Sequence, residues 1–197
     1  MPDSLHLSLW FNDFEPDKML PHALQLIEKF PASSALPGIT GLVLHPISWN
    51  EPTILERRFR PGITPGEAVA VAADLLHDDY AYVFEANWDL WTPETPNREW
   101  SLRPSVVKFI VRGEDFEEGE SKTQGDVEVD FGLDAPFLHE ELEPTNELDS
   151  RVRANLQDLV DFIHRAENNP GLETRLLWSE SDENLAQKLV SRLQKTQ

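Results

Sequence analysis

The chain has 197 residues, of which 36 are acidic and 17 basic, and its formal net charge is −19. It contains no cysteine, which excludes disulfides, thiolate nucleophiles and cysteine-ligated metals. Apolar residues make up 40% of the chain, but the longest strictly apolar run, at 68–73, is far shorter than the ~20 residues of a membrane-spanning helix. We therefore expect a folded cytoplasmic protein that binds neither a membrane nor nucleic acid, because phosphates repel an acidic surface.

The first part of the chain predicts strands and helices in turn. Residues 5–11 alternate apolar and polar side chains with the period of two that is typical of a strand. Residues 17–30 carry an apolar stripe at helical spacing, which predicts a helix. Residues 39–47 indicate a second strand, and 53–59 either its hairpin partner or an edge strand.

A second helix has a clear start signal. Thr64 supplies a cap, Pro65 fits the first helical position, and Glu67 completes the pattern of a capping box. We expect this helix to continue to about Asp78. After it, the alternation of apolar side chains predicts an antiparallel meander of three strands, at 80–91, 104–112 and 126–131, with a proline-containing connection at 92–103.

The last part of the chain predicts a helix at 149–167, a short strand at 173–178 and a final helix after residue 181. Together these elements indicate one compact α+β domain over 1–197, with a mainly antiparallel sheet and helices packed on one face. The opening strand–helix–strand favours a ferredoxin-like arrangement, to which the C-terminal helix–strand–helix is an elaboration.

Sequence motifs of several enzyme classes are absent. The chain has no Gly-x-Gly-x-x-Gly, no Gly-x-x-x-x-Gly-Lys-Ser/Thr and no Gly-x-Ser-x-Gly, which argues against dinucleotide-binding, P-loop and α/β-hydrolase proteins. The six histidines form neither His-x-His nor His-Glu-x-x-His. We therefore expect no metal site and no cofactor.

Strand periodicity places charged side chains on one face of the meander. If the three strands pair in order, two basic residues lie between two acidic rows, opposite the large apolar side chains. Such cross-strand pairs stabilise a sheet weakly, by about 0.2–1 kcal/mol each, and that is one interpretation. The other is a polar recognition face. Its candidate binding residues are Glu85, Asp89, Lys108, Arg112, Asp126, Glu128 and Asp130.

The negative charge is concentrated in one part of the chain. Residues 114–149 contain 14 acids and one base, so most of the net charge lies in two acidic connections, at 113–125 and 136–149, and the strand between them. Such blocks are typical of solvated loops, or they form a surface for a cationic partner. The candidate partner-facing residues are Glu114, Asp115, Glu117, Glu118, Glu120, Glu140, Glu141 and Glu143.

Three functions are consistent with this pattern. We expect a non-catalytic binding module for a basic protein or peptide, as in an inhibitor or immunity-type protein, because acidic charge speeds the encounter with a cationic partner. The alternative is an enzyme that uses paired carboxylates, with or without a divalent cation, and this requires two carboxylates to converge in a cleft. A third interpretation is that the acidity only supports solubility.

Overall fold

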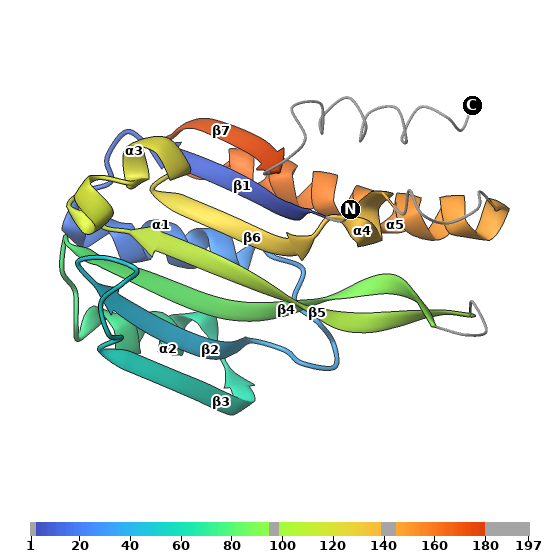
Figure 1. Ribbon diagram of the computed structural model, residues 1–197, viewed down its shortest axis with the longest axis horizontal. Coiled ribbons are helices and arrows are strands. Elements are labelled where there is room, and N and C mark those ends of the chain that lie inside the picture. Colours follow the sequence, from blue (N-terminus) through green and yellow to red (C-terminus); the bar gives the residue numbers. More distant parts are fainter. Residues whose placement is uncertain (1–2, 95–98, 139–144, 180–197) are drawn as a thin grey trace.

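Seven antiparallel strands form one sheet in the computed structural model, which describes residues 3–94, 99–138 and 145–179 (Figure 1). The strand order is β3-β2-β4-β5-β6-β1-β7. The strands are β1 (Ser4–Phe11), β2 (Ile39–Pro46), β3 (Leu55–Ile63), β4 (Tyr80–Glu94), β5 (Glu99–Arg112), β6 (Val127–Leu133) and β7 (Leu172–Ser179). Strands β4, β5 and β6 pair in order, which confirms the predicted meander.

Three longer helices cover one side of this sheet (Figure 1). They are α1 (Pro16–Glu28), α2 (Pro65–Ala73) and α5 (Asn146–Glu167). Phe30, just after α1, and Phe162 of α5 both pack against Phe109 of β5, with ring centroids 5.3 and 6.4 Å away. The core therefore lies between these helices and the apolar face of the sheet. No helix within the described ranges has the length and apolar character needed to cross a membrane.

Short helical segments complete the described structure. They are η1 (Phe116–Glu118), α3 (Ser121–Gln124) and α4 (Ala135–Leu138). The first two lie within the connection between β5 and β6, so this acidic connection is not a plain loop. Figure 1 shows α3 above one end of the sheet, close to β1 and β6.

Helix α2 begins where the sequence predicts it. The Thr64 hydroxyl accepts a hydrogen bond from the Glu67 amide at 3.2 Å, and the Glu67 carboxylate accepts one from the Thr64 amide at 2.9 Å. The helix ends at Ala73 rather than near Asp78. The Tyr82 hydroxyl binds the turn that follows, because it donates to the Leu75 carbonyl and accepts from the His77 amide, both at 2.8 Å.

The predicted connection at 92–103 is wrong. Strand β4 continues to Glu94 and β5 already begins at Glu99, so the two form a long hairpin arm that extends beyond their neighbours (Figure 1). Pro93 and Pro104 lie within this arm. Both are tolerated because neither β2 nor β6 pairs with that part of the hairpin, and a proline on a free strand edge removes no ladder hydrogen bond.

The strand order does not confirm the ferredoxin-like arrangement. Strand β1 lies between β6 and β7, away from β2 and β3, the strands of its own opening unit. The predicted C-terminal helix and strand are present as α5 and β7. The final helix predicted after residue 181 lies outside the described residues.

Candidate functional site

The face of the sheet opposite the core carries the predicted row of alternating charges. Glu85 on β4 lies opposite Lys108 on β5, which in turn lies opposite Asp130 on β6. This register confirms that a base lies between two acidic positions. Period-two alternation positions all three side chains, because their neighbours along each strand are core residues such as Phe84 and Phe109.

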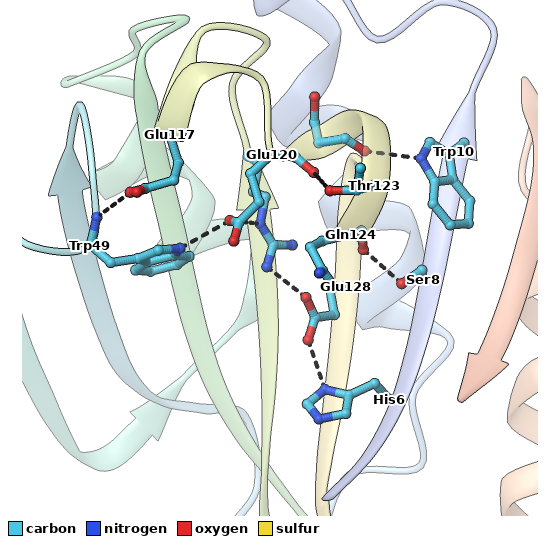
Figure 2. A network of polar contacts seen from close by, with 11 residues as sticks. His6, Ser8, Trp10, Trp49, Glu117, Glu120, Thr123, Gln124 and Glu128 are labelled. Carbon is cyan, nitrogen blue, oxygen red and sulfur yellow. Dashed lines mark hydrogen bonds and ion pairs between the residues drawn. The ribbon is translucent and has the colours of Figure 1, made fainter. Parts of the chain in front are cut away.

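Arg112, the second predicted base, is buried rather than presented on this face. Its side chain is 4% exposed, and its Nε and Nη2 atoms donate to Glu120 at 2.7 Å and Glu128 at 2.6 Å. Glu128 also bonds His6 Nδ1 at 2.7 Å (Figure 2). Burial alone would raise the pKa of Glu128, but the hydrogen bond from His6 and the charge of Arg112 outweigh it and hold the pKa below its ordinary value. Arg112 and Glu128 are thus occupied within the chain.

Two of the predicted partner-facing glutamates, Glu117 and Glu120, accept hydrogen bonds from Trp49 instead. Glu117 accepts from the Trp49 backbone amide at 2.8 Å, and Glu120 accepts from Trp49 Nε1 at 2.9 Å (Figure 2). The ring also packs edge-on against Phe116, with centroids 4.9 Å apart. Trp49 is therefore fixed over the open face, and the carboxylates of Glu117 and Glu120 are engaged inside the chain.

The same network continues to the other edge of the sheet. Segment α3 is fixed to β1 because the Ser8 hydroxyl donates to the Gln124 carbonyl at 2.6 Å and Trp10 Nε1 donates to the Ser121 carbonyl at 2.9 Å (Figure 2). Trp178 of β7 donates to Ser8 at 2.9 Å. Polar contacts thus connect β5, β6, β1 and β7 on one face.

A cavity of about 220 Å³ opens on this face beside Trp49. Its floor is apolar, since Val43, Val83 and Ile110 lie side by side on β2, β4 and β5. The charged row forms one wall, and aromatic rings form the other. The lining residues are Val43, His45, Trp49, Val83, Glu85, Lys108, Ile110 and Asp130.

The polar groups of the cavity are only partly engaged. Glu85 forms an ion pair with Arg58 of β3, and Asp130 Oδ1 accepts from the Gly132 amide at 2.8 Å. No hydrogen bond or ion pair holds the exposed Lys108 ammonium among the described residues. His45 Nδ1 is buried and has no hydrogen-bond partner there, and burial lowers the pKa of this imidazole.

Two acidic segments that are distant in sequence meet at the adjacent end of the sheet through backbone hydrogen bonds. The Asp115 amide donates to the Asp78 carbonyl at 3.0 Å, the Ile47 amide to the Asp79 carbonyl at 2.7 Å, and the Glu117 amide to the Ile47 carbonyl at 2.8 Å. Ile47 itself is 58% exposed. We call five acidic residues of these segments the acidic end: Asp78, Asp79, Glu114, Asp115 and Glu118.

The acidic end lies at the surface. Among the described residues, none of its five carboxylates takes part in an ion pair, and four of them are exposed, with only Asp79 partly buried. Its loops also have unusual backbone conformations, because Ile47, Glu117 and Glu118 have φ angles of 60°, 46° and 55°. Such left-handed conformations are rare for residues other than glycine, and for a β-branched residue they are strained.

The remaining predicted site residues lie elsewhere. The Asp89 carboxylate binds the Ser33 hydroxyl at 2.5 Å and the Ser34 amide at 2.9 Å, so it organises the loop after α1. The Asp126 carboxylate accepts from the Phe11 amide at 2.8 Å, and burial raises the pKa of Asp126. Three predicted partner-facing residues lie outside the described part of the chain: Glu140, Glu141 and Glu143.

Some site residues were missed by the sequence prediction although a signal exists. Val43 and His45 alternate with Leu42 and Leu44, so the period of two places them on the open face. No comparable signal identifies Trp49, because its position depends on contacts with residues about 70 positions later, at 2.8–2.9 Å.

The described residues contain no group of three or more histidines, aspartates or glutamates able to hold a metal ion. Comparisons of the chain with protein-family models, with curated proteins and with solved structures find no match.

Proposed function

We propose that this protein is a non-catalytic binding module whose acidic end recognises a cationic protein or peptide. One observation carries the proposal: backbone hydrogen bonds bring Ile47, whose side chain is exposed, together with two segments that carry five carboxylates without an ion pair among the described residues. Surface carboxylates that serve only solubility need no common location. Here two acidic segments, separated by more than 30 residues in sequence, are joined by backbone hydrogen bonds.

The composition of the acidic end suits a basic partner with an apolar side chain. The concentrated negative charge attracts cations over a Debye length, about 8 Å at physiological salt, and so accelerates association. Ile47, which is bonded through its backbone to both segments, offers an exposed apolar side chain to the partner. The Trp49 contacts with Glu117 and Glu120 fix the adjoining loop, which limits the entropy lost on binding.

A pair of variants with equal charge tests this proposal. The first neutralises the acidic end: Asp78→Asn, Asp79→Asn, Glu114→Gln, Asp115→Asn and Glu118→Gln. The second removes five exposed charges elsewhere: Glu15→Gln, Asp17→Asn, Glu28→Gln, Glu99→Gln and Asp158→Asn. Association of each with an oligo-lysine peptide is measured by stopped-flow fluorescence at several salt concentrations.

Because both variants carry the same net charge, general electrostatic attraction affects them equally. We expect the first variant to associate with the peptide at least about tenfold more slowly than the second at low salt, and the difference to shrink at high salt. Equal rates for the two variants would show that the location of the acidic end does not matter, and the proposal would fall.

A carboxylate-based enzyme remains the second candidate, on one observation. Glu85 and Asp130 line the same cavity, as that hypothesis requires. Acid–base catalysis by two carboxylates needs one of them to keep its proton near the working pH. Carbon-13 NMR titration of the two carboxyl groups tests this. If both are ionised throughout the neutral range, the enzyme hypothesis loses its support.

A further inference from the structure

The cavity beside Trp49 has the size and floor for one long side chain. Its volume is about 220 Å³, and an apolar cavity of about 150 Å³ is large enough to bind benzene. The apolar floor of Val43, Val83 and Ile110 has no polar side-chain atom to contact a hydrocarbon chain. Long cationic side chains bury their methylene groups on such surfaces while the charged end reaches polar atoms.

The aromatic wall suits a planar cation. Trp49 is the residue type that attracts cations most strongly through its ring, and its orientation is fixed by Glu120 and Glu117. Arg112 already lies 5.8 Å from the centroid of this ring, and its charge is compensated by Glu120 and Glu128. The chain thus already places a guanidinium beside this indole.

The charged wall offers carboxylate oxygens to a cation. Each of Glu85 and Asp130 has one carboxylate oxygen without a hydrogen bond or ion pair among the described residues. Lys108, between them, is exposed, and its flexible side chain is not held by an ion pair in that part of the chain. Glu85 is already paired with Arg58, so Asp130 is the carboxylate of the lining that no basic side chain of the described residues holds.

His45 adds an aromatic ring to the lining without a repelling charge. Its ring contacts Trp49 with centroids 4.9 Å apart, and its Nδ1 is closed off from the cavity. Because burial disfavours the protonated imidazole, a neutral His45 does not oppose a cation.

We propose that this cavity receives the guanidinium group of one arginine side chain of the partner, an inference that rests on the proposed binding of a cationic chain. Arginine fits better than lysine, because a planar guanidinium stacks on an indole and donates to two carboxylates at once. The methylene groups lie over Val83 and Ile110, and the guanidinium lies between Trp49 and the oxygens of Asp130 and Glu85.

Titration with N-acetyl-arginine amide, followed by the indole Nε1–H signal of Trp49 in NMR spectra of the full chain, tests the assignment. N-acetyl-citrulline amide is the matched probe, because it has the same shape without the charge. We expect saturable shifts with the arginine probe only. Asp130→Asn should weaken its binding about tenfold, Lys108→Gln should strengthen it, and Glu99→Gln, remote on β5, should leave it unchanged.

Three results would overturn the assignment. They are the absence of a shift of the Trp49 signal, binding of the citrulline probe as tight as that of the arginine probe, or binding of the arginine probe to the Lys108→Gln variant that is weaker than to the parent. The oligo-lysine experiment separates this failure from that of the proposed function. If neutralising the acidic end still slows oligo-lysine association, only the arginine cavity is wrong. If neutralising the acidic end does not slow oligo-lysine association, the proposed binding of a cationic chain at this end is wrong as well.

Discussion

Trp49 and Arg112 donate hydrogen bonds to the same atom, Oε2 of Glu120, at 2.9 and 2.7 Å. One of these donors forms the wall of the cavity, and the other belongs to the buried ion pair with Glu128. A single carboxylate therefore connects the surface that we propose for binding to the interior of the sheet. Glu120 positions Trp49 and is not available to a partner.

Glu120→Gln should loosen Trp49. The neutral amide weakens two charge-assisted hydrogen bonds, which reduces the free energy of unfolding by about 1–3 kcal/mol. The loss is measured by urea denaturation, together with the shift of the Trp49 indole signal. Glu118→Gln, two positions earlier and exposed, is the control, and it should change stability by less than about 0.5 kcal/mol. Similar effects of the two variants would show that the shared carboxylate is unimportant.

Glu128→Gln should be more destabilising than Glu120→Gln. It leaves the buried charge of Arg112 without its closest carboxylate, at 2.6 Å, and we expect a loss of about 3–5 kcal/mol at pH 7. Because the pKa of Glu128 lies below its ordinary 4.5, its stabilising effect is complete above that pH and is lost as the pH falls through the lowered value. Denaturation at several pH values should therefore show the difference from the parent shrinking in acid. A constant difference at all pH values would contradict this account.

Asp126→Asn should have the opposite effect and increase the free energy of unfolding at pH 7. Burial raises the pKa of Asp126, so the folded state binds a proton more tightly than the unfolded state. The parent is thus destabilised as the pH rises above 3.8, the ordinary value, and the destabilisation is complete above the raised pKa. Asparagine keeps an acceptor for the Phe11 amide without the charge. We expect the variant to be the more stable protein at pH 7 and the advantage to vanish near pH 3. Lower stability at pH 7 would be the opposite result.

Ile47→Asn should increase stability and at the same time weaken peptide binding. Asparagine tolerates the backbone φ of 60° at this position far better than isoleucine. Because Ile47 is 58% exposed, the substitution removes little buried apolar surface. We expect a gain in the free energy of unfolding of about 1 kcal/mol, measured by urea denaturation. Binding of an oligo-lysine peptide that contains a leucine should weaken, because the central apolar contact is removed. If that peptide binds unchanged, Ile47 is not part of the interface.

Local patterns explain why the meander could be predicted. The period of two on β4, β5 and β6 fixes which side chains share a face, and Glu85, Lys108 and Asp130 follow from it. The capping box of Thr64 and Glu67 is equally local. In contrast, nothing local distinguishes Glu117, which binds the Trp49 amide, from its exposed neighbour Glu118.

Whether a glutamate of this loop is engaged or exposed depends on the backbone conformation and on partners that are distant in sequence. Glu117 and Glu118 both have positive φ angles, as does Ile47, and no residue type in these loops predicts that. The approach of Asp78 to Asp115 likewise follows from the pairing of β4 with β5, which places the two ends side by side. Tertiary contacts of this kind select which acidic residues remain free to meet a partner.

The most direct test of a cationic partner at the acidic end is chemical-shift mapping of the full chain with an oligo-lysine peptide at low salt. The account predicts that one contiguous set of backbone amides shifts first and saturably, and that these shifts collapse at high salt: Ile47, Asp78, Asp79, Glu114, Asp115 and Glu118. Shifts of equal size at exposed acids outside this end would contradict it: Glu15, Asp17, Glu28 and Glu99.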